Sequence, residues 1–500
     1  MTEAGPASAA IELTTLTDGG QRAADIARLL SGFLARAEKS LDLAVYDLRF
    51  ETDAGGLVLA SLLSAVQRGV AVRLLYNVAH PGPIPVPPPP ETGPEAIESL
   101  PIDTRGVAGI PDLMHHKYVV RDGGAVWTGS TNWTDDSWTR QENVIVTVRS
   151  PKIAYAYSLT FDQLWQTGQV ADTGSDPRPV EIDGASVRPW FCPEHGEALS
   201  HRVAKHIGKA RERVRIASPV LTSGPILATL VEVVNERRCD IGGIVDDTQV
   251  DQVFHQWHTN GVSEWKVPLL QRILEGAEFS GKASIPWTPE SLHDFMHAKV
   301  VVADDTTFVG SFNFSRSGER NAENVLEIRD APIADRIAAY VDELGRATRE
   351  RPSPVRLRHV SGSRGWALPG PTDTNPAIAS ERNAYQHVTY RSRKPNAAVS
   401  DFARHAKSTV RLGEVDVRAL FLIAAAGVLT VVAALLGPAA LAGEKPMRGD
   451  VSRVDLRGVN FIENCRFSHR APDDPIVFPG RAGASHDHTF VGNRSTNASS

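Results

Sequence analysis

Two nine-residue stretches of the chain carry the same reactive side chains at the same spacing: MHHKYVVRD, from residue 114, and MHAKVVVAD, from residue 296. Each contains a histidine, a lysine two positions later and an aspartate five positions after that. The shared residues are His115, Lys117 and Asp122 in the first copy and His297, Lys299 and Asp304 in the second. Because Ala298 stands in the second copy where the first has His116, the repeat singles out the first histidine of the pair.

A second set of polar residues repeats downstream of each stretch. TGSTNW and VGSFNF both contain Gly-Ser-x-Asn, and the Glu of QENVIV or AENVLE follows that Asn at ten positions in both copies. The set comprises Ser130, Asn132, Glu142 and Asn143 in the first copy and Ser311, Asn313, Glu323 and Asn324 in the second. A constellation repeated with nearly the same internal spacing is more specific than any one of its elements.

These residue types can split a phosphodiester in two steps through a covalent intermediate. One histidine attacks phosphorus, while a second protonates the leaving oxygen and then activates water. The duplication supplies one histidine per copy, provided that both copies meet in one pocket. Lysine and asparagine side chains can hold phosphate oxygens, and the two serines can add hydrogen bonds.

The repeated acids have two expected positions. We expect Glu142 and Glu323 to lie behind the histidines, where a carboxylate fixes the imidazole tautomer and raises its basicity. Asp122 and Asp304 belong to the catalytic motif by position. Nevertheless, we expect these two aspartates to close the turn after the motif strand.

The expected elements follow a β-α-β order twice along the chain. Helical spacing and strand-like alternation succeed each other through 20–168 and again through 202–347. This order predicts an α/β fold of two homologous halves, with mixed sheets flanked by helices. His115 and His297 are 182 residues apart, a period that indicates a duplicated domain and not a solenoid. We assign 1–19 to an N-terminal tail, 20–172 to the first half and 173–350 to the second.

Composition limits the partners and cofactors. The net charge of −6 and a pI near 6.3 provide no overall attraction to nucleic acid, whose binders usually show a basic stripe or domain. Three cysteines cannot form a disulfide framework. Cys192 and His195 have a metal-like spacing but too few ligands nearby. We therefore expect no metal ion and no cofactor.

The remainder of the chain differs from the two halves. Residues 351–417 are rich in Ser, Pro, Arg and Asn and predict a disordered linker. Residues 419–443 form a run of 25 residues without a charge, which exceeds the ~20 residues that a membrane-spanning helix needs. We assign 418–443 to one transmembrane helix and 444–500 to the truncated start of an extracytoplasmic domain.

Membrane orientation is expected to be N-terminus inside. The first residues lack the basic and apolar regions of a secretory signal. Basic residues flank both ends of the apolar run equally, so the positive-inside rule does not decide. The expected location is the bacterial cell membrane, with a single-pass anchor and a cytoplasmic catalytic domain.

The two motifs resemble those of the phospholipase D superfamily, whose signature is His-x-Lys-x4-Asp followed by Gly-Ser-x-Asn. The resemblance covers roughly 20–350. It implies two α/β halves that act as an internal dimer, with one shared active site, a phosphohistidine intermediate and no metal ion. The second copy also matches an extended pattern at Ser317, Asn321 and Glu323, where the first has Asp136, Arg140 and Glu142.

Several functions remain open at this level. The first is hydrolysis of a phospholipid headgroup ester, which the membrane segment favours. The alternatives are an endonuclease acting on DNA or RNA and a phosphatidyltransferase, which uses an alcohol in place of water. A non-enzymatic scaffold predicts decay of one motif copy, and both copies are intact. The tail near 465–493 resembles the opening of an uncharacterised domain of secreted bacterial and fungal proteins.

Overall fold

The computed structural model describes most of residues 9–350 and little beyond them. The described residues are 9–78, 97–109, 112–261, 263–286, 288 and 291–350, with a two-stranded antiparallel ribbon of β16 (Phe467–Ala471) and β17 (His488–Val491). The predicted linker at 351–417 and the predicted transmembrane helix at 418–443 lie outside this set. Within it, no helix has both the length and the apolar character needed to cross a membrane.

One mixed sheet forms the centre of the first half, in the order β1-β7-β6-β5-β2-β3-β4. Its strands are β1 (Ile11–Leu16), β2 (Ser40–Val45), β3 (Ala71–Val78), β4 (Asp103–Ala108), β5 (Lys117–Arg121), β6 (Ala125–Gly129) and β7 (Asn143–Arg149). β2, β3 and β4 run parallel, and the other neighbours run antiparallel. The boundary predicted for the N-terminal tail is wrong at β1, because Leu13 and Leu16 are buried as this strand pairs with β7.

The second half repeats this sheet, in the order β12-β11-β10-β13-β14-β15-β9-β8. Its strands are β8 (Val180–Ile182), β9 (Ala185–Cys192), β10 (Arg213–Ser218), β11 (Asp240–Asp246), β12 (Glu278–Lys282), β13 (Val300–Ala303), β14 (Thr306–Gly310) and β15 (Glu323–Arg329). β10, β11 and β12 are the parallel strands. Apart from β8, each strand has a counterpart in the first half at the same place in the order, so the topology confirms the duplication.

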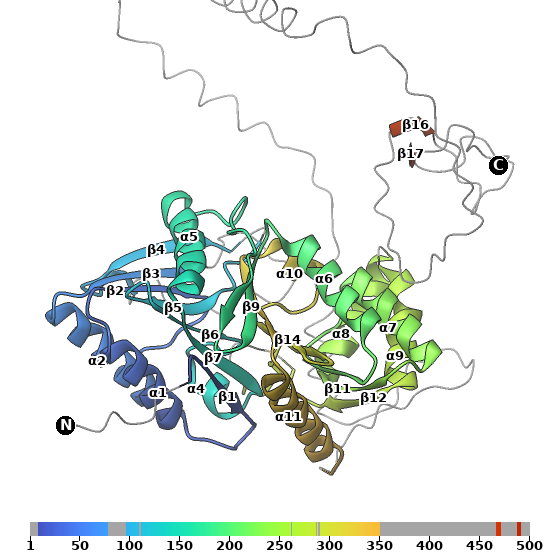
Figure 1. The fold of residues 1–500 in the computed structure, drawn as a ribbon, viewed down its shortest axis with the longest axis horizontal. Helices are drawn as coiled ribbons and strands as arrows, with labels where there is room; N and C mark the ends of the chain where they lie inside the picture. Colours follow the sequence, from blue (N-terminus) through green and yellow to red (C-terminus); the bar gives the residue numbers. More distant parts are fainter. Residues whose placement is uncertain are drawn as a thin grey trace, which may run out of the picture. The chain divides into compact units, whose positions relative to one another are not determined.

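Helices flank both sheets and also lie between them (Figure 1). The first half contains α1 (Ala23–Ala35), α2 (Asp53–Gln67), α4 (Asp135–Thr139) and α5 (Pro151–Thr167). The second contains α6 (Gly196–Lys209), α7 (Gly224–Glu236), α8 (Asp247–Asn260), η1 (Glu264–Lys266), α9 (Val267–Gly276), α10 (Arg316–Arg320) and α11 (Ala331–Glu350). Figure 1 shows α1 and α2 on one outer flank and α6, α7 and α9 on the opposite flank.

The two halves share a hydrophobic core. One buried cluster contains Val144 and Val146 of β7, Leu326 of β15, Tyr157 of α5 and Ile337 of α11. Each half also has its own outer core, between its sheet and its flanking helices. Burial of apolar surface across both halves stabilises their pairing, which brings the two motif loops to one interface.

The glycine of each Gly-Ser-x-Asn motif permits a close approach of two strands. A Cβ on Gly129 would lie 2.1 Å from the carbonyl oxygen of Val144, and one on Gly310 would lie 2.0 Å from that of Asn324. The serine that follows each glycine donates its backbone N–H to the same carbonyl, at 3.0 and 2.9 Å. Glycine is therefore required at this position for steric reasons in both halves.

Candidate active site

Each motif histidine contacts a side chain of the opposite half. Nδ1 of His115 lies 2.9 Å from Oε2 of Glu323, and Nδ1 of His297 lies 3.2 Å from Oδ1 of Asn143. The partner of one histidine is a carboxylate, and the partner of the other is a neutral amide. The two equivalent positions of the repeat therefore have different chemical surroundings.

A one-residue difference in pairing between the halves explains the unequal partners. Met114, which precedes the first histidine, forms a parallel bridge with Ala322, whereas Met296 forms one with Glu142. Ala322 aligns with Gln141 in the repeat, so the second bridge is displaced by one position. The residue after each bridge lies beside the histidine, and it is a glutamate on one side and an asparagine on the other.

The expected position of Glu142 behind a histidine is wrong. Its carboxylate accepts hydrogen bonds from Nζ of Lys282 at 2.9 and 3.1 Å, and Nζ also lies 3.5 Å from Asp18. Burial raises the pKa of Glu142, and Lys282 acts in the opposite direction. Glu323 lies behind His115 as expected, so one of the two repeated glutamates supports a histidine.

The amide of Asn143 is held with its oxygen toward His297. Its Nδ2 donates to the carbonyl oxygen of Ser137 at 3.0 Å, and the hydroxyl of Ser130 donates to its Oδ1 at 2.7 Å. With Oδ1 as the acceptor, Nδ1 of His297 carries the proton that joins them. Ser130 therefore orients the histidine's partner, a role different from the phosphate contact expected from the sequence.

The motif lysines are buried beside the histidines. Nζ of Lys117 donates to the carbonyl oxygen of His115 at 2.7 Å, and Nζ of Lys299 donates to that of His297 at 2.6 Å. Burial lowers the pKa of Lys117 to about 7, although Glu323 raises it. Burial also lowers the pKa of Lys299, and the charge of Lys117 adds to that effect.

Charged groups of both halves affect the pKa of each motif histidine. Burial lowers the pKa of His115 well below its ordinary value, and Lys117 and Lys299 lower it further. Burial likewise lowers the pKa of His297, with contributions from both lysines and from His115. These effects favour the neutral form of both rings. An anionic phosphate bound among these cations would raise both pKa values.

Both motif asparagines have spare hydrogen-bonding capacity. Within the part of the chain that the structure describes, Oδ1 of Asn132 and Oδ1 of Asn313 are buried without a hydrogen-bond partner. Unpaired buried polar atoms are rare in folded proteins and cost stability, so such atoms often mark functional positions. Ser311 differs from them, because its Oγ accepts the backbone N–H of Asn324 at 3.0 Å.

The two motif aspartates stabilise turns at the far end of the motif strands. Asp122 accepts the backbone N–H groups of Glu38, Lys39 and Ser40, at 2.6 to 3.1 Å. Asp304 accepts the corresponding three from residues 211–213, at 2.9 to 3.2 Å. Both have positive φ, at 53° and 52°. Both aspartates therefore lie away from the motif histidines, although the sequence placed them among the catalytic residues. Their expected role of closing the turn after the motif strand is confirmed.

His116, which has Ala298 as its counterpart in the second copy of the motif, is a buried core residue. Its Nδ1 lies 3.2 Å from Oδ1 of Asn324, whose Nδ2 donates to the hydroxyl of Thr128 at 2.6 Å. Burial lowers the pKa of His116 to about 3, so the ring is neutral.

Two site residues were missed by the sequence analysis. The ring of Tyr46, after the end of β2, lies 4.6 Å from the His115 ring and 4.7 Å from Nζ of Lys117, measured from its centroid. Asp47 is buried beside it, and burial raises its pKa to about 6 despite Arg49 and Lys117. Both residues follow the carboxyl end of β2, the strand that pairs with β5, and this position could have identified them as site residues.

Metal ligands do not cluster in this site. Among the described residues, no group of three or more His, Cys, Asp and Glu side chains is arranged to hold a metal ion. The arrangement instead offers two imidazoles, two ammonium groups and two amides. These groups can supply a nucleophile, an acid and hydrogen bonds to a phosphate.

Parts of the chain are similar to known proteins. The family described as "Cardiolipin synthase, PLD-like domain" matches residues 30–165 and 203–344. The mitochondrial cardiolipin hydrolase of Xenopus tropicalis is 33% identical over 138 residues, which are 27% of this chain and 58% of that protein. A phospholipase D of Rickettsia bellii is 27% identical over 157 residues, 31% of this chain and 67% of that protein.

A solved structure is similar over a longer part of the chain. The phosphatidylserine synthase of Haemophilus influenzae has a TM-score of 0.48 and 14% identity, and the match covers 68% of this chain and 86% of that one. The chain matches only 58% of the length of that cardiolipin hydrolase. Because the family match includes both copies of the motif and more than half of the residues, this chain belongs to the phospholipase D superfamily, with two PLD-like domains.

Proposed function

We propose that this chain is a phospholipase D-type phosphodiesterase that hydrolyses the headgroup ester of a phospholipid. The observation that carries the proposal is the contact of His115 with Glu323 across the two halves, 2.9 Å long. It gives one histidine a charged partner within a site that also holds the second histidine's lysine. The names of the cardiolipin hydrolase and phospholipase D relatives favour a lipid substrate.

In this proposal His115 is the nucleophile. Its Nδ1–H faces Glu323, which leaves the lone pair on Nε2 to form a bond with phosphorus while the P–O bond to the headgroup breaks. The ring gains positive charge as the P–N bond forms. The carboxylate of Glu323 stabilises that charge, as a group aimed at developing charge lowers the barrier.

His297 acts as the general acid and then as the general base. Protonated in the presence of the anionic substrate, it transfers a proton to the leaving headgroup oxygen. The neutral ring then takes a proton from water, whose oxygen attacks phosphorus as the P–N bond breaks and His115 is released. The neutral amide of Asn143 gives the charged ring no ionic stabilisation, which favours release of the proton.

Lysine and asparagine side chains hold the phosphate during both steps. Each motif lysine uses one N–H on a histidine carbonyl, which leaves two donors for non-bridging oxygens. Asn132 and Asn313 are candidates to donate to the same oxygens through their Nδ2 groups. These contacts strengthen as negative charge develops in the transition state.

A substrate panel with single variants tests the proposal. The full chain is assayed on phospholipid vesicles, on single-stranded DNA and on bis(p-nitrophenyl) phosphate, with and without a primary alcohol. We expect headgroup release from lipid, and a loss of several orders of magnitude in H115A and in H297A. H116A is expected to lose little activity. Cleavage of DNA without cleavage of lipid would contradict the lipid assignment, and alcohol-dependent product would indicate transfer.

Activity is expected to survive chelation by EDTA. The histidines supply the nucleophile and the acid, and the lysines supply positive charge, so the proposed steps involve no metal ion. Loss of activity in EDTA that a divalent ion restores would contradict this expectation.

Membrane attachment is proposed from the sequence alone. Residues 419–441, which lie outside the described residues, would anchor the catalytic halves on the cytoplasmic face of a bacterial membrane. Protease treatment of intact cells decides: a tag before Met1 should be shielded, and one after Ser500 should be digested. The reverse pattern would place the catalytic halves outside.

A further inference from the structure

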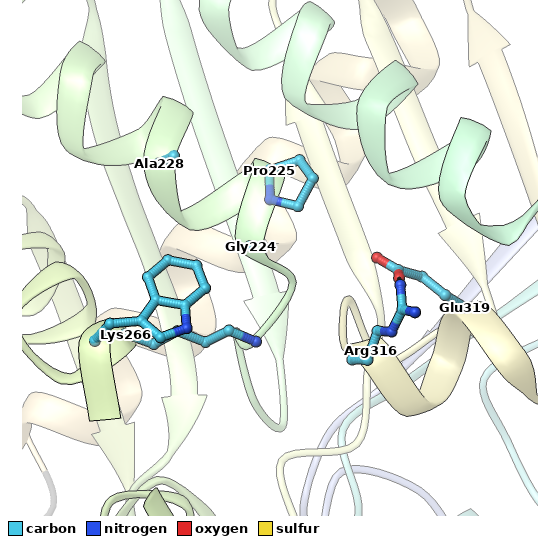
Figure 2. Close-up of a pocket in the computed structure, with 7 residues that line it drawn as sticks. Gly224, Pro225, Ala228, Lys266, Arg316 and Glu319 are labelled. Carbon is cyan, nitrogen blue, oxygen red and sulfur yellow. The ribbon is translucent and has the colours of Figure 1, made fainter. Parts of the chain in front are cut away.

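A cavity of about 440 Å³ lies in the second half, beside the first turn of α7 (Figure 2). Gly224 and Pro225 of this helix line it on one side, and Trp265 and Lys266 of η1 line another. Figure 2 shows the Lys266 side chain extending toward the wall formed by α10. None of these residues takes part in the chemistry proposed above.

Two cations line this cavity from different elements. Lys266 is buried, and its Nζ donates to the carbonyl oxygen of Thr222 at 2.9 Å. Arg316 lies on the α10 wall, with 70% of its side chain exposed. Burial lowers the pKa of Lys266, Glu319 raises it, and the charge of Arg316 lowers it again. Both cations thus line the same cavity.

The carboxylate in the lining does not satisfy both cations. Glu319 accepts hydrogen bonds from Ser200 at 2.6 Å, Ser223 at 3.3 Å and Arg316 at 3.0 Å. Two cations and one carboxylate, among the described lining residues, leave an excess of one positive charge. Glu319 is already bonded to these three donors. An anion that enters the cavity would therefore meet the N–H groups of Lys266 and Arg316 that do not donate to Thr222 or Glu319.

An exposed tryptophan forms the apolar wall of the cavity. The side chain of Trp265 is a large apolar group with 58% exposure, and its ring centroid lies 5.5 Å from Nζ of Lys266. Tryptophan next to lysine and arginine is the side-chain combination enriched where proteins meet the headgroup level of a membrane. Basic pockets at that level bind lipid phosphates.

The cavity lies at the same sheet edge as the catalytic loop of the second half. The N–H groups of Thr222 and Ser223 donate to the carbonyl oxygen of Phe314, at 3.1 and 2.9 Å, and Phe314 follows Asn313. Arg316 comes three positions after Asn313, a chain distance of at most about 11 Å. A surface that presents one lipid to the active site would therefore also present lipid to the cavity.

We propose that this cavity binds the phosphate of an anionic phospholipid headgroup other than the one being cleaved. Arg316 and Lys266 hold the phosphate oxygens, and Trp265 contacts the adjoining glycerol. The proposal rests on the lipid substrate proposed above, and it adds a second lipid contact that would position the enzyme on anionic membranes.

Vesicle binding by the full chain tests this site. Binding of the H115A protein, which removes turnover, is compared on phosphatidylcholine vesicles with and without phosphatidate. We expect the phosphatidate-dependent part of the affinity to fall roughly tenfold in R316Q, the loss typical of one charge-assisted hydrogen bond. Lys266→Met should show a similar loss. The matched control is R320Q, which removes the same charge from the same helix, where Arg320 pairs with Asp112 outside the cavity.

The outcomes separate the site from general charge attraction. An equal loss in R316Q and R320Q, or no loss in R316Q, would overturn the proposal. Inorganic phosphate that binds through Arg316 as tightly as the phosphatidate vesicles do would also overturn the proposal, because the cavity would then be a site for the free ion. Arg316-dependent binding of single-stranded DNA would assign the cavity to nucleic acid instead.

Vesicle binding, taken together with the substrate panel on the chain that retains His115, distinguishes failure of this site from failure of the proposed function. Binding is measured without turnover, so Arg316-dependent binding by a chain that cleaves no lipid would leave the site standing and remove the lipid hydrolase. Lipid cleavage without Arg316-dependent binding would leave the lipid hydrolase standing and remove the cavity site.

Discussion

His115 and His297 occupy equivalent positions in the repeat, yet their partners differ in charge. The carboxylate of Glu323 faces one ring, and the amide of Asn143 faces the other. A carboxylate stabilises an imidazole that acquires positive charge, whereas an amide only fixes its orientation. This difference is the basis for assigning the nucleophile to His115 and the acid to His297.

At the residue level, the repeat indicated the buried lysines and histidines because identical side chains recurred at identical spacing. It could not indicate Tyr46, whose contact with His115 depends on the adjacency of β2 and β5 in the sheet. The turn-closing role of Asp122 was predictable, since Asp at a strand end often binds backbone N–H groups.

Asp122→Asn tests the structural role of the motif aspartates. Burial raises the pKa of Asp122, but hydrogen bonds from three backbone N–H groups outweigh it and lower the pKa overall. Because the folded pKa is lowered, the carboxylate stabilises the protein above about pH 4, and this contribution is lost as the pH falls below that value. Asn should therefore reduce stability at pH 7 by about 1 kcal/mol, since these hydrogen bonds are largely exposed to solvent, which weakens them.

Denaturant unfolding of both proteins between acidic and neutral pH measures this effect. The stability difference between wild type and D122N should shrink as the pH falls, while kcat/KM at pH 7 stays nearly unchanged. A large loss of kcat/KM with unaltered stability would assign Asp122 a direct catalytic part.

At the level of elements, period and order predicted most strands and helices of both halves. β1 was missed because it is a short edge strand whose burial depends on pairing with β7. The displacement of the bridges at Met114 and Met296 was also beyond the sequence, since packing between the halves sets this register. A one-residue change in pairing places a different side chain beside each histidine.

Glutamine substitutions of the two repeated glutamates test this register. Glu323→Gln removes the charge behind His115 and should lower kcat/KM roughly 10²–10³-fold, the range for removal of one group that stabilises developing charge. Burial raises the pKa of Glu323 to about 7. Ionisation of this carboxylate near pH 7 should raise wild-type kcat/KM, while loss of the Lys117 proton, whose pKa is also about 7, should lower it, so the profile should have a maximum near pH 7. In E323Q the rising part of this profile should disappear.

Glu142→Gln is the matched control. It leaves the buried ammonium of Lys282 with Asp18, 3.5 Å away, as its remaining anionic partner, and should reduce stability by up to about 3 kcal/mol. Its kcat/KM and pH profile should remain close to those of wild type. Equal catalytic losses in E142Q and E323Q would show that the two halves are functionally symmetric.

At the level of the whole molecule, duplication followed by divergence accounts for the arrangement. The shared core fixes the halves against each other, so each supplies a histidine and a partner for the histidine of the other half. The sequence predicted two halves with one site, because single motifs lack the second histidine. The unequal roles of the halves appear only in their three-dimensional pairing.

Capture of the covalent intermediate tests the central claim that His115 is the nucleophile and His297 the acid and base. In the H297A protein, bis(p-nitrophenyl) phosphate should still react, because p-nitrophenolate leaves without protonation, whereas hydrolysis of the intermediate should be slow. We predict a burst of one p-nitrophenolate per chain and, by mass spectrometry, a p-nitrophenylphosphoryl adduct on His115. A burst retained in H115A, with the adduct on His297, would contradict the account.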